Sequence, residues 1–181
     1  EKKVTSLIGV GVEGFNVTMP HKEEVIKYID ELSESALYVN AVNTVFVDKG
    51  IAKGFNTDCE GFVRSLKENF GYGVEGDSVL MLGAGGAAKA VFHGLKNLGI
   101  TSTYVSRTKQ ADMLTYEELT PEIIAENTII VNATPVGMFP NVDACPDIPY
   151  ECLTKNHLLY DLLYNPDTTL FMKKGAERGA K

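Results

Sequence analysis

The stretch SVLMLGAGGAAKAVFHGLKNLG, residues 78–99, decides the fold of this chain. It opens with a strand-length apolar run, and the glycine-rich string GAGGAA follows at 83–88. The residues behind this string have the spacing of a helix that reaches Leu98, with Gly99 placed as its C-terminal glycine. A strand, a glycine turn and a helix in this order are typical of a unit that binds the pyrophosphate of a dinucleotide.

Three small residues of the turn have separate roles in such a unit. Gly83 permits the tight turn after the strand, Gly85 lets the backbone approach the pyrophosphate, and Ala88 lets the helix pack closely on the sheet. The start of the helix then offers backbone N–H groups to the anion. The alternative is an ordinary glycine-rich turn without a ligand, which the flanking strand and helix disfavour.

The rest of this half continues the same alternation of strand and helix. Such alternation predicts a parallel, doubly wound α/β sheet. Between Gln110 and Leu119 the chain is too short for the helix that should follow the second strand. We expect further strands at 103–105, 128–132 and 157–163, and further helices at 120–127 and 168–178.

The residues before this half favour a second, smaller α/β unit. Thr57 and Glu60 have the spacing of a capping box, and the helix behind them is expected to link the two domains. We therefore place a first domain at 1–57, to which the family resemblance described below assigns substrate binding, and a dinucleotide-binding domain, with its linker helix, at 58–181. The first domain is expected to contain strands near 4–8 and 15–17, a helix at about 21–32, and a hairpin of strands at 42–47 and 51–55.

Composition and charge narrow the class of protein. The chain has 181 residues, 44% of them hydrophobic, and 17 basic against 24 acidic side chains give a net charge of −7. This balance disfavours nucleic acid or an anionic membrane as partner. No apolar run approaches the roughly 20 residues of a membrane-spanning helix, and no secretory signal is expected. Three cysteines without metal-ligand spacing indicate neither a disulfide framework nor a zinc site, so a reducing cytoplasm is the expected setting.

The end of the second strand of the sheet bears on the choice of cofactor. An NAD site usually has Asp or Glu there, to bind the ribose 2′-hydroxyl. This chain has Ser106-Arg107-Thr108, followed by Lys109. Because an arginine can bind a 2′-phosphate and stack on adenine, and the next two residues add donors, NADP is the better prediction. The alternative is that Arg107 is a solvated surface charge.

Lys22 and Asp58 are candidates for proton transfer. Lys22 falls in the first turn of the helix expected at 21–32, where the helix dipole disfavours a cation and favours the neutral amine. The residue could therefore exchange a proton with a substrate hydroxyl, or it could be a solvent-facing lysine. Asp58 follows Thr57 at a helix start, so it could equally serve the helix dipole. Cys59 and the three scattered histidines are expected to be structural.

Several strings, in order, resemble the shikimate dehydrogenase family. These are NVTMPHK at 16–22, AVNT at 41–44, NTD at 56–58, NATPVGM at 132–138 and YDLLYNP at 160–166. The resemblance covers nearly the whole chain. It implies a substrate-binding α/β domain followed by a Rossmann-type NADP domain.

The resemblance also implies an activity and a set of site residues. The expected reaction is the NADP-dependent, reversible reduction of 3-dehydroshikimate to shikimate in aromatic amino-acid biosynthesis, without a metal, by a monomer or homodimer. Lys22 and Asp58 would be catalytic, and Thr18, Asn43 and Tyr164 would bind the substrate. The expected cofactor-binding residues are Gly83, Ala84, Gly85, Gly86, Ala87, Ser106, Arg107, Thr108, Thr134 and Leu162.

Three departures from the family pattern keep alternatives open, and the first is the missing helix between Gln110 and Leu119. The family's SxSxxxHN segment, with two substrate-binding serines, has no counterpart near Ser6, and the closing NGLGMLxxQ segment is absent from these 181 residues. One alternative is a catalytically silent NADP-binding module. The other is a quinate/shikimate dehydrogenase that uses NAD, which the lack of an acidic residue near Arg107 disfavours.

Overall fold

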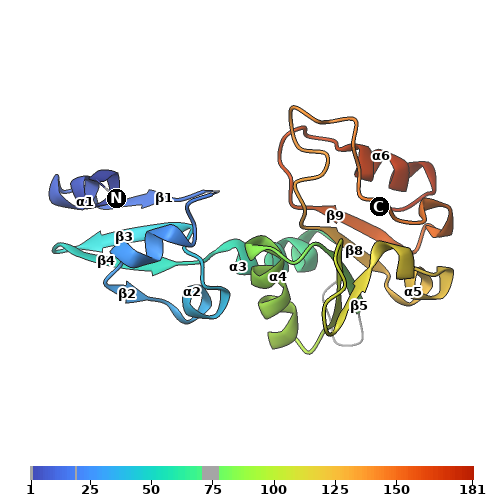
Figure 1. Cartoon of the computed structure of the whole chain (residues 1–181), viewed down its shortest axis with the longest axis horizontal. Helices are drawn as coiled ribbons and strands as arrows, with labels where there is room; N and C mark the ends of the chain where they lie inside the picture. Colours follow the sequence, from blue (N-terminus) through green and yellow to red (C-terminus); the bar gives the residue numbers. More distant parts are fainter. Residues whose placement is uncertain (1, 19, 71–77) are drawn as a thin grey trace.

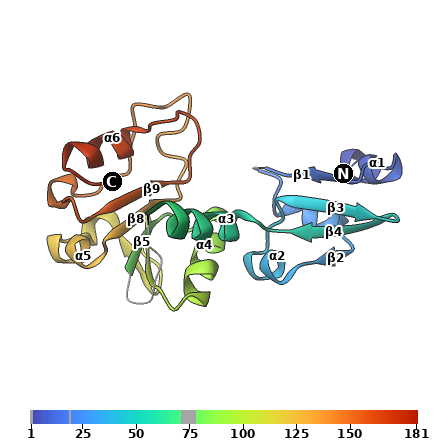
Figure 2. The same cartoon turned by 180° about the vertical axis from the view of Figure 1, so that it is seen from behind.

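The computed structural model describes residues 2–18, 20–70 and 78–181 (Figure 1). Two β-sheets lie at opposite ends of an elongated molecule, and helix α3 (Asp58–Ser65) runs between them. Figure 2 shows from behind how α3 passes from the first sheet onto the second. A turn of π-helix, Leu66–Phe70, continues α3.

The larger sheet is parallel throughout and confirms the doubly wound prediction. Its strands are β5 (Ser78–Leu82), β6 (Thr101–Ser106), β7 (Met113–Thr115), β8 (Ile129–Asn132) and β9 (Leu158–Asp161). They lie in the order β7-β6-β5-β8-β9. The chain moves outward from β5 in one direction and then returns to add β8 on the other side. Ligands of open α/β sheets bind at such a switch point, beyond the carboxyl ends of the strands.

Helices cover both faces of this sheet. Successive strand residues point to opposite faces and are apolar on both, so each face has to be buried. Val79 and Met81 face the cluster formed with α3 and α4 (Gly86–Asn97), whereas Leu80 and Leu82 face α5 (Pro121–Glu126) and α6 (Leu170–Glu177). All four strand residues are fully buried. Short 3₁₀ turns at Tyr116–Glu118 and Tyr150–Cys152 complete this half.

The smaller sheet has the order β1-β3-β4-β2. The hairpin predicted around Asp48 is confirmed: β3 (Thr44–Asp48) and β4 (Ile51–Phe55) are antiparallel, and the turn residues Lys49 and Gly50 both have positive φ. Strand β1 (Gly14–Asn16) pairs with β3, and β2 (Glu31–Leu32) runs parallel to β4.

Two predictions for this part were wrong. Residues Lys2–Gly9 form helix α1 rather than a strand, because Val4, Leu7 and Ile8 have the i, i+3, i+4 spacing of a helix. The helix expected at 21–32 is reduced to a 3₁₀ turn, η1 (Glu24–Tyr28). The chain is extended at Ile29, and the Asp30 carboxylate accepts a hydrogen bond from the backbone N–H of Ala52, which draws the following residues into the sheet.

Two further features of the helices differ from expectation. Helix α2 (Glu34–Val39) was not predicted, although Ser33 caps it by accepting a hydrogen bond from the N–H of Ala36. The capping box expected at Thr57 does not form. Its hydroxyl instead donates to Asn43 Oδ1, 3.2 Å away, which ties the start of α3 to the smaller sheet.

The junction between the two halves is packed tightly at α4. Val39 and Ala41 bury apolar surface against Ala90 of this helix. Gly94, also in α4, faces α3, where a Cβ added to it would collide with Cys59 Sγ and lie 3.0 Å from Val63 Cγ2. Burial raises the pKa of the Cys59 thiol, which fits the structural role expected for this residue.

A glycine-to-alanine pair tests this packing. We expect Gly94→Ala to lower the free energy of unfolding by about 1–3 kcal/mol through overpacking. The matched control is Gly61→Ala in α3, where an added Cβ meets nothing within 4 Å. Because alanine favours helix over glycine, this control should be neutral or raise stability by about 0.5–1 kcal/mol. Urea denaturation measures both, and equal effects would contradict close α3–α4 packing.

Candidate active site

A pocket of about 990 Å³ opens between the two halves of the molecule. Its larger-sheet wall is formed beyond the carboxyl ends of β5, β8 and β9, which is the switch point identified above. Its other wall comes from the smaller half and the start of α3. The residues predicted as site residues that line it are Thr18, Lys22, Asp58, Gly86, Ala87, Thr134, Leu162 and Tyr164.

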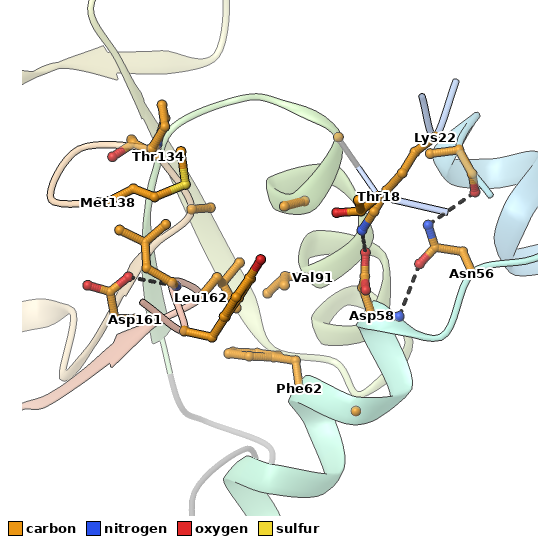
Figure 3. A pocket seen from close by; sticks show the side chains of 18 of the residues that line it. Thr18, Lys22, Asn56, Asp58, Phe62, Val91, Thr134, Met138, Asp161 and Leu162 are labelled. Atoms are coloured by element: carbon orange, nitrogen blue, oxygen red, sulfur yellow. Dashed lines mark hydrogen bonds and ion pairs between the residues drawn. The ribbon is translucent and has the colours of Figure 1, made fainter. Parts of the chain in front are cut away.

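Lys22 and Asp58 form an ion pair on the wall of this pocket. The Lys22 ammonium Nζ donates to Asp58 Oδ2 at 2.6 Å, with the two side chains 25% and 33% exposed. Asp58 Oδ1 accepts a second hydrogen bond from Asn43 Nδ2, also at 2.6 Å. Both carboxylate oxygens are therefore engaged, and the carboxylate is fixed in orientation. The partly exposed lysine retains access to the pocket (Figure 3).

Hydrogen bonds at the ends of β3 and β4 hold this group in place. Asn43 Oδ1 accepts from the N–H of Thr57, and the buried Asn56 accepts from the N–H of Asp58 while donating to the carbonyl of Ala41. The backbone of Lys22 is held too, since its carbonyl accepts from the N–H of Val42 at 2.8 Å.

The helix-dipole argument for Lys22 is therefore corrected. Lys22 precedes η1, a 3₁₀ turn of five residues, so it does not occupy the first turn of a long helix. Its neighbour is the carboxylate of Asp58, 36 residues further along the chain. An ammonium group that is held by a carboxylate and open to a pocket can exchange a proton with a hydroxyl or carbonyl oxygen bound there.

The glycine turn has the shape of a pyrophosphate site. Gly83 has a φ of +102°, and a Cβ on it would lie 2.9 Å from Thr134 Cγ2, so a larger residue does not fit. A Cβ on Gly85 would meet nothing within 4 Å, which leaves open space before the helix. Gly85 is also the N-cap of α4 and supplies no side-chain cap. Among the described residues no side-chain cap is made at the start of this 12-residue helix, whose first N–H groups suit an anionic ligand.

Residues predicted for the cofactor lie in three places, of which the loops that carry Thr134 and Leu162 are described below. Gly83 to Ala87 form the turn and the start of α4, where Gly86 and Ala87 line the pocket. Ser106 ends β6, the neighbouring strand, and Arg107 and Thr108 follow it with exposed side chains outside the lining of this pocket. Lys109, which was expected to add a donor, is paired with the Glu118 carboxylate at 2.8 Å.

The pocket wall opposite the ion pair consists of two loops. One follows β8 and contributes Thr134 and Met138, and the other follows β9 and contributes Leu162 (Figure 3). Tyr164 also comes from the loop after β9. Tyr164 is 87% exposed, so its ring is available to a ligand. One pocket thus brings together four residues predicted for the substrate and the cofactor, namely Thr18, Thr134, Leu162 and Tyr164. Asn43 lies behind Asp58 and is bonded to it.

Sequence reasoning missed several polar residues of this pocket, among them Glu23, Asn56 and Asp161. Glu23 comes from the smaller half, and its carboxylate lies 3.9 Å from where a Cβ on Gly86 would be, so the two halves face each other here. Asn56 orients the start of α3. Asp161 ends β9 and lines the pocket. Its place at the carboxyl end of a parallel strand was a usable signal.

His157 has structural surroundings, as expected. His157 is buried, with Nδ1 accepting from the N–H of Thr154 and Nε2 lying 3.0 Å from the carbonyl of Ile124. Within the described residues, no group of three or more His, Cys, Asp or Glu side chains could hold a metal ion. Nor is any helix in the described ranges long and apolar enough to cross a membrane.

Known proteins match this chain along its whole length. The family profile described as "Shikimate dehydrogenase substrate binding domain" matches residues 1–45. The shikimate dehydrogenase (NADP(+)) of Desulforamulus reducens is 36% identical over 199 residues, which cover 100% of this chain and 68% of that protein. The chain therefore spans about two thirds of the length of this relative.

Solved structures share the fold. A shikimate dehydrogenase in complex with NADP+ has a TM-score of 0.89 and 33% identity, covering 99% of this chain and 68% of its own. The Thermus thermophilus enzyme, in complex with NADP(H) and shikimate, has a TM-score of 0.85 and 31% identity over 99% and 69% of the two chains. A Corynebacterium glutamicum quinate dehydrogenase in complex with NAD has a TM-score of 0.84 and 30% identity, again over 99% and 69%. The fold alone therefore does not decide the cofactor.

Proposed function

Because the chain belongs to the shikimate dehydrogenase family, we propose that it catalyses the NADP-dependent, reversible reduction of 3-dehydroshikimate to shikimate, a step of aromatic amino-acid biosynthesis. One observation carries this proposal. The Lys22–Asp58 ion pair and the start of α4 border the same pocket. A substrate in this pocket would therefore lie between a proton-transfer group and the site for the cofactor's pyrophosphate.

NADP fits the residues present. When bound, it supplies the hydride for the ketone or accepts one from the alcohol. The open space at Gly85 and the N–H groups of α4 would hold the pyrophosphate, and Arg107 beyond β6 would bind the 2′-phosphate. Thr134 and Leu162, from the loops after β8 and β9, would lie beside the nicotinamide.

Lys22 supplies the proton that the reduction requires. Its ammonium group gives a proton to the carbonyl oxygen as that oxygen becomes a hydroxyl, and the neutral amine takes the proton back in the reverse direction. Asp58 keeps the amine at the pocket wall, and Asn43 fixes the carboxylate. Thr18 and Tyr164 border the same space and are assigned to the substrate.

The division of the chain follows from this assignment. Residues 1–57 form the substrate-binding domain, and residues 58–181 form the NADP-binding domain with α3 as the link. The substrate is a small molecule. A cytoplasmic location and a monomeric or homodimeric state stay predictions.

The steady-state rate of formation of the reduced cofactor, NADPH or NADH, tests the proposal. The chain is assayed with shikimate or quinate, each with NADP+ or NAD+. The shikimate and NADP+ combination should give the highest kcat/KM. Higher kcat/KM with quinate and NAD+ would favour the NAD-using alternative, and tight NADP+ binding without turnover of either substrate would favour the silent module.

A further inference from the structure

Asp161 lines the pocket at the point where two parallel strands end together. Asp161 is the last residue of β9, and its partner in register is Asn132, the last residue of β8. Asn132 is fully buried, and Asp161 is partly buried and lines the pocket. Figure 3 shows Asp161 beside Leu162, near the loop that carries Thr134 and Met138.

One oxygen of this carboxylate serves both pocket loops. Asp161 Oδ1 accepts from the N–H of Leu163 at 3.0 Å, which holds the loop after β9. The same oxygen accepts from Asn132 Nδ2 at 3.1 Å. That bond fixes the Asn132 amide, whose Oδ1 accepts from the N–H and the hydroxyl of Thr134 at 3.0 and 2.7 Å. The loop after β8 is thereby held through the same atom.

The other oxygen has a different task. Asp161 Oδ2 accepts from the Thr169 hydroxyl at 2.7 Å. Thr169 is buried and is the N-cap of α6, where its hydroxyl also accepts from the N–H of Met172. This oxygen therefore supports the position of a helix on the far face of the sheet. Oδ1 therefore positions the pocket loops, whereas Oδ2 stabilises the scaffold.

The loops that Oδ1 connects form the wall opposite Lys22. They meet a second time at the rim, where the N–H of Phe139 donates to the carbonyl of Asn165. These two contacts fix the distance between the loops. That distance determines the position of a ligand bound against Thr134 and Leu162. A displacement of about 1 Å in the groups that position reactants can lower a rate by about 10²-fold.

We infer that Asp161 is a positioning residue for the reaction, which through a single carboxylate oxygen holds the two loops of the cofactor-side wall at a fixed separation facing Lys22. The inference rests on the proposed function. It requires a hydrogen-bond acceptor at the place of Oδ1, and it does not require a negative charge.

Three variants separate position, charge and scaffold. Asp161→Asn preserves shape, and its amide oxygen can accept from Asn132 and Leu163 while its NH₂ faces the Thr169 hydroxyl. Asp161→Glu preserves charge but adds a methylene that displaces the acceptor. Thr169→Val removes the α6 cap and the bond to Oδ2 and leaves the bonds to Oδ1 intact.

The expected results follow from this division. Asp161→Glu should lower kcat by about 10–100-fold, while Asp161→Asn should remain within about threefold of the unaltered chain. Thr169→Val should lower the melting temperature by several degrees, as loss of a helix cap does, with kcat of the folded protein within about twofold. Affinity for 2′,5′-ADP, which probes the Arg107 end of the site, should change little in all three.

Each contrary outcome is distinct. Full turnover in Asp161→Glu would overturn the inference, and so would a loss in Asp161→Asn as deep as that in Asp161→Glu, because charge would then be the relevant property. A fall of kcat in Thr169→Val in proportion to its lost stability would assign Asp161 to the scaffold alone. Absence of turnover in the unaltered chain would instead contradict the proposed function.

Discussion

Replacing Lys22 by methionine is expected to lower kcat for shikimate oxidation by about 10²–10⁴-fold, the contribution typical of a positioned general acid or base. Methionine keeps a long apolar stem but carries no exchangeable proton. The pocket wall therefore remains filled while proton transfer is lost. Affinity for NADP+ should stay within about twofold, because Lys22 belongs to the half that the proposal assigns to the substrate, and the loss should appear in kcat rather than in cofactor binding.

Lys27→Met is the matched control for this variant. Lys27 lies five residues further on, in η1, and its ammonium pairs with Glu24 at 2.9 Å on the exposed surface. Its replacement also removes one positive charge and breaks one ion pair, and it should leave kcat unchanged. Turnover within tenfold of the unaltered chain in Lys22→Met would remove the lysine from the mechanism. Equal losses in both variants would point to net charge instead.

Arg107→Ala should raise the KM for NADP+ by about 10–100-fold and leave the KM for NAD+ nearly unchanged. A hydrogen bond to a charged group contributes about 1.5–3 kcal/mol, and each 1.4 kcal/mol corresponds to about tenfold in affinity. Only NADP carries the 2′-phosphate that this guanidinium would bind. The exposed Arg107 side chain directly follows β6, where such contacts are made in dinucleotide-binding sheets.

Lys109→Ala serves as the comparison for Arg107. Its ammonium lies 2.8 Å from Glu118 Oε1, so its charge is already compensated within the protein. The KM for NADP+ should therefore change by less than about threefold. Equal changes in KM for NADP+ and NAD+ in Arg107→Ala would show that the arginine supports the fold of the strand end and does not select the cofactor.

Predictions from sequence succeeded where local pattern and tertiary structure agree. The run 78–99 combines an apolar strand, glycines that a tight turn requires and a helix with a C-terminal glycine, and the structure has each of these. The hairpin at 44–55 was found for a similar reason, since Lys49 and Gly50 occupy a turn of positive φ. Each of these features is specified by residues close together in the chain.

Predictions failed where distant contacts decide the structure. The helix expected at 21–32 is cut short because Asp30 bonds the backbone of Ala52 in the sheet. The polar spacing of Thr57 and Glu60 suggested a capping box, yet the Thr57 hydroxyl is drawn to Asn43. Helix α1 is a different case, because the helical spacing of Val4, Leu7 and Ile8 is local and was nevertheless interpreted as a strand.

The residues of the candidate site likewise divide into those that local sequence pattern can locate and those that depend on distant contacts. The glycine turn and the strand end at Arg107 could be located from local pattern alone. The pairing of Lys22 with Asp58 could not, since their side chains meet across 36 residues, and only the family resemblance joined them. Asp161 was overlooked because its role depends on Asn132, a neighbour that only the register of β8 and β9 reveals.

A single-turnover experiment tests the central claim most directly. The chain, in excess over NADPH, is mixed with 3-dehydroshikimate, and the loss of NADPH absorbance is followed while NADPH fluorescence reports binding. The proposed site predicts that bound NADPH is oxidised completely and that Lys22→Met binds NADPH equally but oxidises it about 10²–10⁴-fold more slowly. NADPH that binds to the unaltered chain and remains reduced in the presence of 3-dehydroshikimate would contradict the account.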